Sequence, residues 1–470
     1  MTSILGGGLG GLSSAYYLLR GGVHSSRIKL FESSSRLGGW IRSVEENGVT
    51  FECGPRTIRP VGEPGRNTLA LLEELNLENA IIPILRSSPA AQRRLIYVRG
   101  QLHVLPSSFK SLFKKTSPFS RPLITALFHD LRTGKSLKSL EDESIYDFTK
   151  RRFGQEMADY AISPMICGIC AGNAKEISVK FLMKDIFEKE QHYGGVIRGL
   201  LADRFSGKEK KATETLGKLA SRARDEKWAI YSLEGGLETL PETLKKHLQS
   251  KDVSISLESD CEEINFSPNG INLSFKDKKE KSKSVISTLP AYKLAEIVRK
   301  QHPKLGEMLS GIPYVDVGVV NLHFSSPDAL NEKGFGFLAA PSENIPILGV
   351  IFDSCCFDMK DSTVLTVMMG GHWFKQHFGE SPTEDTLLST ARKYLKDILK
   401  IEDDPENVRV NILKKCIPQY VIGHHARVEA IREYLRDQKL SLGLAGAAYD
   451  GVGVNDVILS ARKAAEQHFS

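Results

Sequence analysis

The segment Ile4-Leu5-Gly6-Gly7-Gly8-Leu9-Gly10-Gly11 places the motif G-x-G-x-x-G directly after a short apolar stretch. The apolar residues Leu12 to Leu19 then predict a helix, and Ile28 to Phe31 predict a strand that ends at Glu32. Glycines in such a turn let the backbone approach a pyrophosphate, and the helix offers unpaired N–H groups. Glu32 follows about 20 residues later, where a carboxylate can accept hydrogen bonds from ribose hydroxyls. This stretch therefore predicts a dinucleotide-binding unit.

Two further motifs follow soon after Glu32, namely Arg36-Leu37-Gly38-Gly39-Trp40 and Phe51-Glu52-Cys53-Gly54-Pro55-Arg56. A glycine trio alone is equally compatible with an ordinary glycine-rich turn. A nicotinamide-binding unit, however, does not need the second glycine pair. Together these residues resemble the flavoprotein superfamily of amine oxidases, carotenoid desaturases and protoporphyrinogen oxidases. The resemblance implies non-covalent FAD and a Rossmann-like FAD-binding domain, so that the fold is α/β at its centre and α+β overall.

Length and composition set the broad class of protein. The 470 residues are 41% hydrophobic and carry a net charge of +6, so the chain can bury a large core in two or more domains. This modest charge does not indicate nucleic-acid binding. No apolar run approaches the ~18 residues that span a bilayer, and residues 345–352 predict a buried strand instead. A cleavable leader is not expected, because its removal would destroy the glycine motif.

The seven cysteines are irregularly spaced, which argues against a disulfide framework. Cys167-Gly168-Ile169-Cys170 has the form C-x-x-C. Neither a second cysteine pair nor nearby histidines complete a metal site, and a thioredoxin-like βαβ context is missing. We therefore predict buried, reduced thiols and no metal site.

Patterns beyond residue 228 predict that the FAD-binding domain is discontinuous. Residues 237–248 carry an apolar stripe at helical spacing, and residues 253–257 and 285–290 predict strands. A hairpin is expected around 267–270, and the charged run 276–281 is interpreted as a solvated turn. The strand at 285–290 is expected to return to the cofactor domain.

The C-terminal residues repeat the strand–glycine–helix pattern. Residues 442–446 predict a strand, Tyr449 to Asp456 form a glycine-rich loop, and residues 457–469 predict a helix capped by Asn455 or Asp456. A helix N-terminus aimed at the flavin would stabilise its anionic reduced form. An ordinary strand–turn–helix terminus is the alternative interpretation.

Residues 310–370 contain several strand-like runs without long intervening helices, which indicates a mainly antiparallel sheet. Residues 384–400 predict a helix with one apolar face. We therefore expect a substrate domain built on this sheet, together with a helical membrane-binding subdomain. The expected segments are 1–90, 206–290 and 411–470 for FAD binding, 91–205 for the helical subdomain and part of the substrate cavity, and 291–410 for the substrate-binding sheet and its helices.

Essentially the whole chain is similar to the oxygen-dependent, animal-type protoporphyrinogen oxidases. The resemblance rests on residues 36–43, 89–94, 170–173, 416–424 and 445–456. It implies oxidation of protoporphyrinogen IX to protoporphyrin IX, with O2 as the oxidant and release of hydrogen peroxide. It also implies a homodimer without a nucleic-acid partner, attached peripherally (monotopically) to the intermembrane-space side of the mitochondrial inner membrane.

The resemblance also implies two sets of site residues and no catalytic side chain, because the flavin performs the chemistry. Arg94 would hold a propionate of the substrate through two parallel N–H···O bonds, although by itself it could equally be a surface arginine beside Arg93. The substrate set is Arg94, Gly168, Phe335, Gly336, Leu338 and Met368. The FAD set is Gly6, Gly7, Gly8, Leu9, Gly10, Gly11, Glu32, Ser33, Trp40, Gly54, Pro55, Arg56, Thr57, Cys261, Ala447, Val452, Gly453 and Val454.

A basic segment runs from Arg93 to Lys138, with ten Lys or Arg residues and a single acid, Asp130. Phenylalanine and leucine residues are interleaved with these cations. Such a composition suits an anionic lipid surface, and the alternative is a helical subdomain whose apolar face packs inward. The family resemblance favours membrane attachment.

Two other classes of protein remain open. One is an FAD amine oxidase or a carotenoid-type desaturase. The other is a prenyl-GTPase dissociation inhibitor, a non-catalytic binding module of related fold that holds no flavin. The glycine motif and the C-terminal glycine loop argue against this module, and the absorption spectrum of the purified protein would separate the two classes.

Overall fold

The computed structural model describes residues 1–134, 141–206, 216–357 and 359–467. Contacts divide the chain into two compact units. Unit 1 comprises Met1–Pro83, Leu216–Pro313 and Ala426–Ser470, and unit 2 comprises Ile84–Thr215 and Tyr314–His425. The helices α13 (Ala291–Val298) and α14 (Pro303–Ser310) therefore lie in unit 1, whereas the sequence-based boundaries placed residues 291–313 with the substrate-binding sheet.

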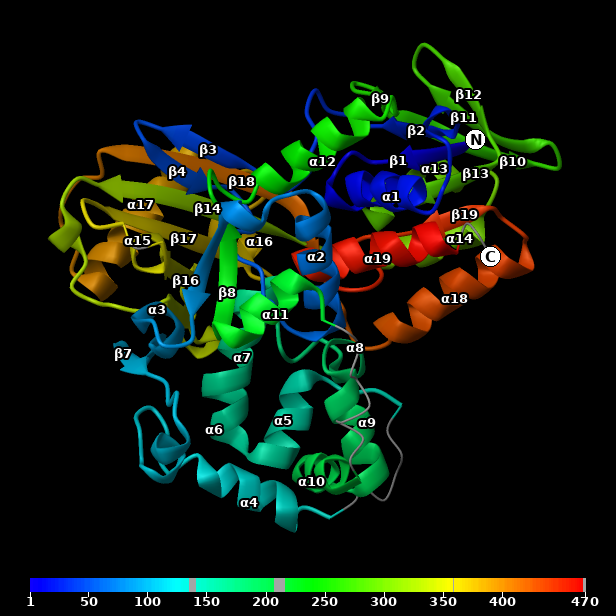
Figure 1. Ribbon diagram of the computed structural model, residues 1–470. Coiled ribbons are helices and arrows are strands. Elements are labelled where there is room, and N and C mark those ends of the chain that lie inside the picture. The colour runs from blue at the N-terminus through cyan, green and yellow to red at the C-terminus, as the bar shows by residue number, and fades with distance from the viewer. Residues whose placement is uncertain (135–140, 207–215, 358, 468–470) are drawn as a thin grey trace. The chain divides into compact units, whose positions relative to one another are not determined.

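Unit 1 is built around a five-stranded sheet in the order β19-β13-β1-β2-β9. All four pairings are parallel, with Ile4 between Leu30 of β2 and Ile286 of β13 (Figure 1). The discontinuous Rossmann-like sheet that the sequence predicts is thus confirmed. Its strands are β1 (Thr2–Leu5), β2 (Ile28–Phe31), β9 (Ser254–Ser256), β13 (Ser284–Ser287) and β19 (Leu442–Leu444).

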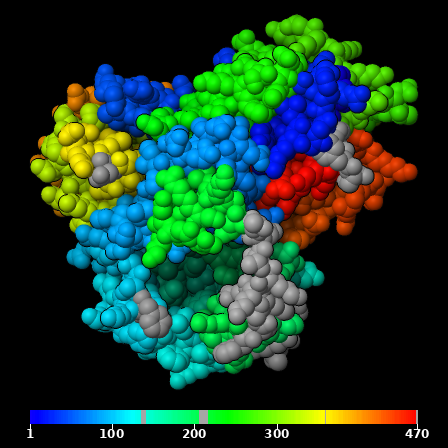
Figure 2. Space-filling model, in the orientation of Figure 1, coloured from blue at the N-terminus to red at the C-terminus, as the bar shows by residue number. Residues whose placement is uncertain are grey.

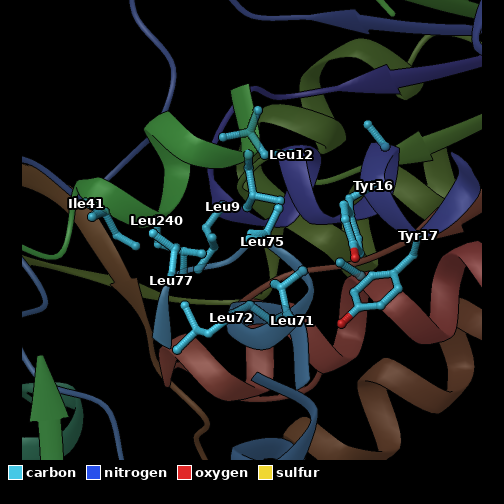
Figure 3. Packing of buried hydrophobic residues seen from close by; sticks show 14 of the residues in the cluster. Leu9, Leu12, Tyr16, Tyr17, Ile41, Leu71, Leu72, Leu75, Leu77 and Leu240 are labelled. Carbon is cyan, nitrogen blue, oxygen red and sulfur yellow. The ribbon is translucent and has the colours of Figure 1, made fainter. Parts of the chain in front are cut away.

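Helices from all three chain segments pack around this sheet. They are α1 (Leu9–Arg20), α2 (Gly62–Glu74), α12 (Thr239–Ser250) and α19 (Val454–Glu466). Figure 3 shows Leu9 of α1 beside Leu77 and Leu240, and all three side chains are buried in one cluster. Each such leucine contributes roughly 1.5–3 kcal/mol by burial. The apolar stripe predicted for residues 237–248 is fully buried, which confirms that helix.

A small antiparallel sheet in unit 1 corrects one sequence-based expectation. The predicted hairpin forms from β10 (Cys261–Ser267) and β11 (Gly270–Phe275). The charged run 276–281 is not only a turn, because β12 (Lys279–Ser282) pairs antiparallel with β11. Lys279 and Lys281 are exposed on this edge strand. Short, charged edge strands are common because their charge prevents unwanted pairing with other strands. Such strands lack the alternation of apolar and polar residues from which a strand is predicted.

Unit 2 contains a seven-stranded sheet in the order β18-β14-β17-β16-β15-β6-β7. Every pairing is antiparallel except that between β15 and β6, so the predicted mainly antiparallel sheet is confirmed. Leu387 and Ala391 of α17 (Glu384–Tyr394) pack on one face. The strands are β6 (Arg94–Val98), β7 (Gln101–Val104), β14 (Tyr314–Phe324), β15 (Gly336–Ala339), β16 (Ile347–Phe352), β17 (Thr363–Gly371) and β18 (Asn407–Pro418).

The helical part of unit 2 contains buried charges. The side chain of Arg152 is fully buried, pairs with Glu190, and lies 3.6 Å from Asp130. Asp130 also accepts the backbone N–H of Ile197 at 2.8 Å, so the network joins three helices and the start of a fourth. These are α4 (Ile124–Arg132), α5 (Ile145–Phe153), α9 (Lys184–Tyr193) and α10 (Val196–Ser206).

Within the described ranges, no helix combines the length and apolar character needed to cross a bilayer. The described part of the basic segment that includes α4 has exposed residues on unit 2 and is cyan in Figure 2. The remaining elements are β3 (Ser43–Glu46), β4 (Val49–Glu52), β5 (Ile81–Leu85), α3 (Pro89–Gln92), α6 (Gln155–Met157), α7 (Ser163–Cys170), α8 (Val179–Leu182), α11 (Lys218–Asp225), β8 (Trp228–Leu233), α15 (Asp353–Cys356), α16 (Phe374–Phe378) and α18 (His424–Asp437).

Candidate functional site

The glycine turn between β1 and α1 is held tightly enough to require glycine. Gly6 has a φ of +100°, and a Cβ on Gly11 would overlap the carbonyl oxygen of Gly6. Gly8 is the N-cap residue of α1 and has no side chain to cap it, so the first N–H groups of the helix have no side-chain partner there. A Cβ on Gly8 would meet only the backbone of Gly39, at 3.6 Å. The turn therefore leaves room for a group beside uncapped helix donors.

Glu32 places its carboxylate beside this turn. It follows β2, and its Oε2 accepts the backbone N–H of Gly7 at 2.6 Å. Its Oε1 accepts the N–H of Ser34 at 2.9 Å and the hydroxyl of Ser34 at 2.8 Å. The neighbouring Ser33 is exposed. Oε1 also accepts the Ser33 hydroxyl at 3.3 Å, so Oε2 is the oxygen with more room for a ribose hydroxyl, and that role of Glu32 stays a prediction.

The second glycine pair lies against the same turn. Gly38 donates its N–H to the carbonyl of Gly7 at 2.9 Å. This hydrogen bond brings Trp40, two residues further on, close to the glycine turn. The Trp40 side chain is 44% exposed although the neighbouring Ile41 is buried. A Cβ on Gly54 would overlap the carbonyl oxygen of Trp40, so this chain approach also requires glycine. The next three expected FAD residues differ in accessibility: Pro55 is exposed, Arg56 is buried and Thr57 is half-buried.

The C-terminal loop reaches the glycine turn from the other side. A Cβ on Gly10 would lie 3.5 Å from Cγ1 of Val457, and Asn455 donates to the carbonyl of Arg59 at 2.8 Å. The helix starts at Val454 with Gly453 as N-cap, so the predicted cap at Asn455 or Asp456 is wrong. Asp456 is instead the N3 residue of the first turn, and its carboxylate accepts the N–H of the N-cap residue Gly453 at 3.2 Å. The predicted end of this helix at 469 lies outside the described residues.

Two expected FAD residues lie further from the turn. Cys261 begins β10, two residues after Ser259, whose N–H bonds to the carbonyl of Glu32 at 2.8 Å. The Cys261 thiol is buried, which raises its pKa to about 12, so a contact there would use the backbone. Ala447 follows β19 and is half-buried. Both residues belong to unit 1, as do all the other expected FAD residues.

These residues fit FAD. The turn offers uncapped N–H groups for a pyrophosphate, Glu32 offers acceptors for a ribose, and Trp40 offers an exposed aromatic surface for an isoalloxazine ring. Residues 451–457, which span the end of the C-terminal loop and the first turn of α19, are half-buried. From Gly6 to Gly11 the turn carries no acid, and its one large side chain, that of Leu9, is buried.

The expected substrate residues all lie in unit 2 and are brought together by strand register. Arg94, the first residue of β6, is the parallel partner of Gly336 in β15. Phe335 precedes β15 and donates its N–H to the carbonyl of Arg93 at 3.0 Å. Residues separated by about 240 positions therefore become neighbours through a single strand pairing, which no local pattern could indicate.

Three residues paired in a row across the same sheet include the apolar members of the expected substrate set. Leu338 of β15 pairs with Gly349 of β16, which pairs with Met368 of β17. Leu338 and Met368 are half-buried, whereas most neighbouring strand residues are buried. Gly168 of α7 packs on this row, because a Cβ there would lie 2.9 Å from Cδ2 of Leu338. The row and α7 together offer an apolar surface with little room for side chains at Gly168.

Arg93 and Arg94 differ in their partners. The guanidinium of Arg93 lies 3.3 Å from Glu332 in an exposed ion pair. Arg94 is exposed, and among the described residues it has no acidic partner. Arg94 is therefore the arginine of the two that can offer both N–H groups of its fork to an external carboxylate.

All seven cysteines are free thiols, and only Cys355 is less than fully buried. Cys167 and Cys170 are buried, as the sequence predicts, and burial raises the pKa of each thiol to about 12, which disfavours the thiolate. In the described part of the chain, no three His, Cys, Asp or Glu side chains are grouped as metal ligands.

The sequence-based prediction missed the polar residues that fix the C-terminal loop. Asp450 pairs with Arg432 at 2.6 Å and accepts the hydroxyl of Ser460 at 2.5 Å. Asn455 was interpreted as a helix cap, but its side chain bridges to Arg59. The acid at 450 within a glycine loop was the only signal in the sequence, and nothing local identified its partners.

Comparison with known proteins identifies the class of protein to which this chain belongs. Residues 9–467 match the family of flavin-containing amine oxidoreductases, and the chain belongs to that family. FAD is accordingly its cofactor, and the chain is a flavin-dependent oxidoreductase. A solved structure of a candidate protoporphyrinogen oxidase from Exiguobacterium sp. 255-15 superimposes with a TM-score of 0.78 at 24% identity, covering 99% of this chain and 98% of that one. A putrescine oxidase structure gives a TM-score of 0.66 at 13% identity, covering 100% and 98%. Both share the fold.

Curated relatives narrow the family further. Protoporphyrinogen oxidase of Bos taurus is 38% identical over 98% of this chain and 97% of its own length. The Homo sapiens enzyme is 37% identical with the same coverage, and that of Schizosaccharomyces pombe is 30% identical over 99% and 98%. Within the flavin-containing amine oxidoreductases, the chain therefore belongs to the protoporphyrinogen oxidase family.

Proposed function

We propose that this protein oxidises protoporphyrinogen IX to protoporphyrin IX with bound FAD, using O2 and releasing hydrogen peroxide. The observation that carries this proposal is similarity at 37–38% identity, along almost the full length, to the mammalian protoporphyrinogen oxidases. The residues that the same family resemblance assigns to the substrate are assembled on one sheet, with Arg94 opposite Gly336 and beside the apolar row, which is consistent with this proposal. Amine oxidation is the second candidate, but the putrescine oxidase similarity is only 13%.

Each group of residues has a distinct task in this reaction. Bound FAD would supply the two-electron oxidising chemistry of each of three rounds, with O2 as the final electron acceptor. The glycine turn, Glu32 and the C-terminal loop bind and orient that cofactor. Arg94 anchors a propionate of the substrate and thereby fixes its orientation. Leu338 and Met368 offer an apolar surface to the macrocycle and exclude water from it.

One experiment tests the reaction directly. The purified holoprotein is mixed anaerobically with protoporphyrinogen IX while the flavin absorbance is followed. We expect rapid bleaching, followed by recovery of the absorbance and formation of hydrogen peroxide when O2 is admitted. Bleaching by putrescine or another amine, but not by protoporphyrinogen, would identify an amine oxidase instead. Colourless protein that cannot be reconstituted with FAD would indicate a binding module.

The basic segment of unit 2 supports attachment to an anionic membrane surface. Lys110, Lys114, Lys115 and Arg121 are exposed, and Phe113 and Phe128 expose 55% and 53% of their surface nearby in the sequence. Cations beside exposed aromatic rings suit lipid headgroups. We place the protein peripherally (monotopically) on the mitochondrial inner membrane, facing the intermembrane space. Lys135 and Lys138 of the predicted segment lie outside the described residues.

Two-fold association is the remaining part of the proposal. The family resemblance supports a homodimer, and the chain's moderate charge does not oppose self-association. Light scattering of the detergent-solubilised holoprotein would measure its mass. A mass of twice the 52.1 kDa chain is expected, and a mass of one chain would reject the dimer.

A further inference from the structure

A chain of polar contacts holds the C-terminal glycine loop, and none of its members belongs to the expected FAD set. The backbone N–H of Gly446 donates to the hydroxyl of Ser460 at 3.0 Å, and that hydroxyl donates to Asp450 Oδ2 at 2.5 Å. Asp450 Oδ1 accepts from the guanidinium of Arg432 at 2.6 Å. One carboxylate thus joins the loop to two helices, α18 through Arg432 and α19 through Ser460.

Other contacts also hold this loop, since Asn455 donates to the carbonyl of Arg59, Asp456 accepts the N–H of Gly453, and Ala448 and Tyr449 are buried. The loop lies between β19, which ends at Leu444, and α19, which begins at Val454. Gly446 has a φ of +112° and Gly451 a φ of +141°, so the loop contains two backbone positions that most residues adopt rarely. A loop of this kind is selected from several conformations by the contacts at its ends. Asp450 supplies such contacts at the residue before Gly451.

The geometry is more specific than that of an ordinary surface ion pair. The side chains of Arg432 and Asp450 are 35% and 30% exposed, so the pair by itself would contribute little to stability. One oxygen of Asp450 accepts a hydrogen bond from Arg432 and the other accepts one from Ser460, whose side chain is buried. This arrangement fixes the position of a loop more than it stabilises the whole fold.

We propose that Asp450 is a positioning residue for the cofactor. By tying the loop to Arg432 and Ser460, it sets the place of Val452, Gly453 and the N-terminus of α19, which belong to the expected FAD set. The helix N-terminus carries a partial positive charge, so its position affects both the affinity for FAD and the ease with which bound FAD is reduced. This inference rests on FAD binding and is independent of which substrate the enzyme oxidises.

The chain offers a matched control for the test. Arg432 also pairs with Glu429, at 3.4 Å, within α18 and away from the loop. Asp450→Asn removes the negative charge but keeps a side chain of similar size with one oxygen. Glu429→Gln makes the same change at the other carboxylate that pairs with Arg432. FAD is titrated into each apoprotein, and its fluorescence quenching gives the dissociation constant. We expect Asp450→Asn to raise that constant about tenfold, as for loss of one charge-assisted hydrogen bond, and Glu429→Gln to leave it within about twofold.

Two further measurements separate positioning from general destabilisation. The thermal unfolding midpoint of the apoprotein should be similar for both variants. The midpoint potential of bound FAD should fall in Asp450→Asn alone, and Asp450→Glu should restore much of the affinity. If Asp450→Asn does not fold, Ser460→Ala tests the same contact by removing a single hydroxyl. Equal FAD affinities and potentials in the loop variant and in Glu429→Gln would overturn the proposal.

Discussion

The two units of this protein are expected to recognise small molecules in different ways. In unit 1, the expected cofactor contacts depend on backbone groups and on the absence of side chains, as at Gly6 and Gly11. In unit 2, the expected substrate contacts are side chains on separate strands, assembled by register, as at Arg94 and Leu338. Backbone recognition constrains residue type at fixed spacing and leaves a motif in the sequence. Side-chain recognition on a sheet leaves no such spacing.

The largest effect should come from the glycine turn. Gly8→Glu would place a carboxylate where the pyrophosphate is expected and should abolish FAD binding, as measured by flavin absorbance of the purified protein. Gly8→Ala is the matched control. Its Cβ would meet Gly39 at an ordinary 3.6 Å, so this variant should fold and retain measurable FAD. Full occupancy in Gly8→Glu would show that unit 1 does not bind the cofactor through this turn.

The buried charges of unit 2 give the next largest effect. Burial alone would raise the pKa of Glu190, but hydrogen bonds from Arg151 and Arg152 outweigh it and hold the pKa below its ordinary 4.5. This carboxylate therefore stabilises the fold above pH 4.5, and that stabilisation is lost as the pH falls through its lowered pKa. Glu190→Gln removes the nearer carboxylate of buried Arg152 and leaves, among the described residues, only Asp130, at 3.6 Å, so it should lower the free energy of unfolding by about 3–5 kcal/mol at pH 7.

The control for this prediction lies on the same helix. Glu188 pairs with Lys184 at 3.7 Å, and both side chains are more than half exposed. Glu188→Gln should change the free energy of unfolding by less than about 1 kcal/mol in urea titrations. Similar losses in the two variants would mean that burial does not distinguish these ion pairs.

Reversing four cations of the basic segment should weaken membrane binding. The change replaces Lys110, Lys114, Lys115 and Arg121 with glutamate, and each lost cation should cost roughly 1 kcal/mol at low salt. Sedimentation with anionic vesicles measures it, and added salt should reduce the binding of the unaltered protein. The control reverses four exposed cations of unit 1, Lys276, Lys279, Lys281 and Lys283. Equal losses would indicate that net charge, and not this surface, causes binding.

The smallest effect concerns the substrate arginine. Arg94→Ala should raise the KM for protoporphyrinogen by an amount equivalent to about 1.5–3 kcal/mol, with FAD content unchanged. Arg94→Lys should recover part of this, because it keeps the charge without the fork. Arg93→Ala should change KM little, since that side chain pairs with Glu332. Steady-state kinetics in which both alanine variants behaved alike would reject Arg94 as the anchor.

The difference between the units also explains how much of the fold could be predicted from the sequence. Periodicity and glycine spacing predicted the strands of the parallel sheet and the helices α1, α12 and α19, and strand-like runs in residues 310–370 predicted a mainly antiparallel sheet. The helix α2 and the strands β6, β7 and β18 were not predicted. Periodicity failed at β12, where charge masks an edge strand, and at the start of α19, where glycine rather than Asn455 is the cap. Both failures occur where backbone geometry overrides side-chain preference.

For the same reason, the cofactor-binding part of the site could be predicted better than the substrate-binding part. Glu32 and the glycines could be placed from one segment, because their contacts are local. The substrate set was available only from family resemblance, since Arg94 meets Gly336 through a parallel pairing of distant segments. The Asp450 contacts could not be predicted, because Arg432, Asp450 and Ser460 meet only after a helix, a loop and a second helix have folded together.

The interleaving of unit 1 along the chain has a consequence for biosynthesis. Its sheet begins with β1 at residues 2–5 but is completed only by β19 at residues 442–444. During translation, the N-terminal glycine turn must wait for the last strand and for α19 while the segments of unit 2 are produced. We therefore expect cofactor binding only after β19 and α19 have been made, and nascent chains stalled before residue 442 should be unable to capture FAD.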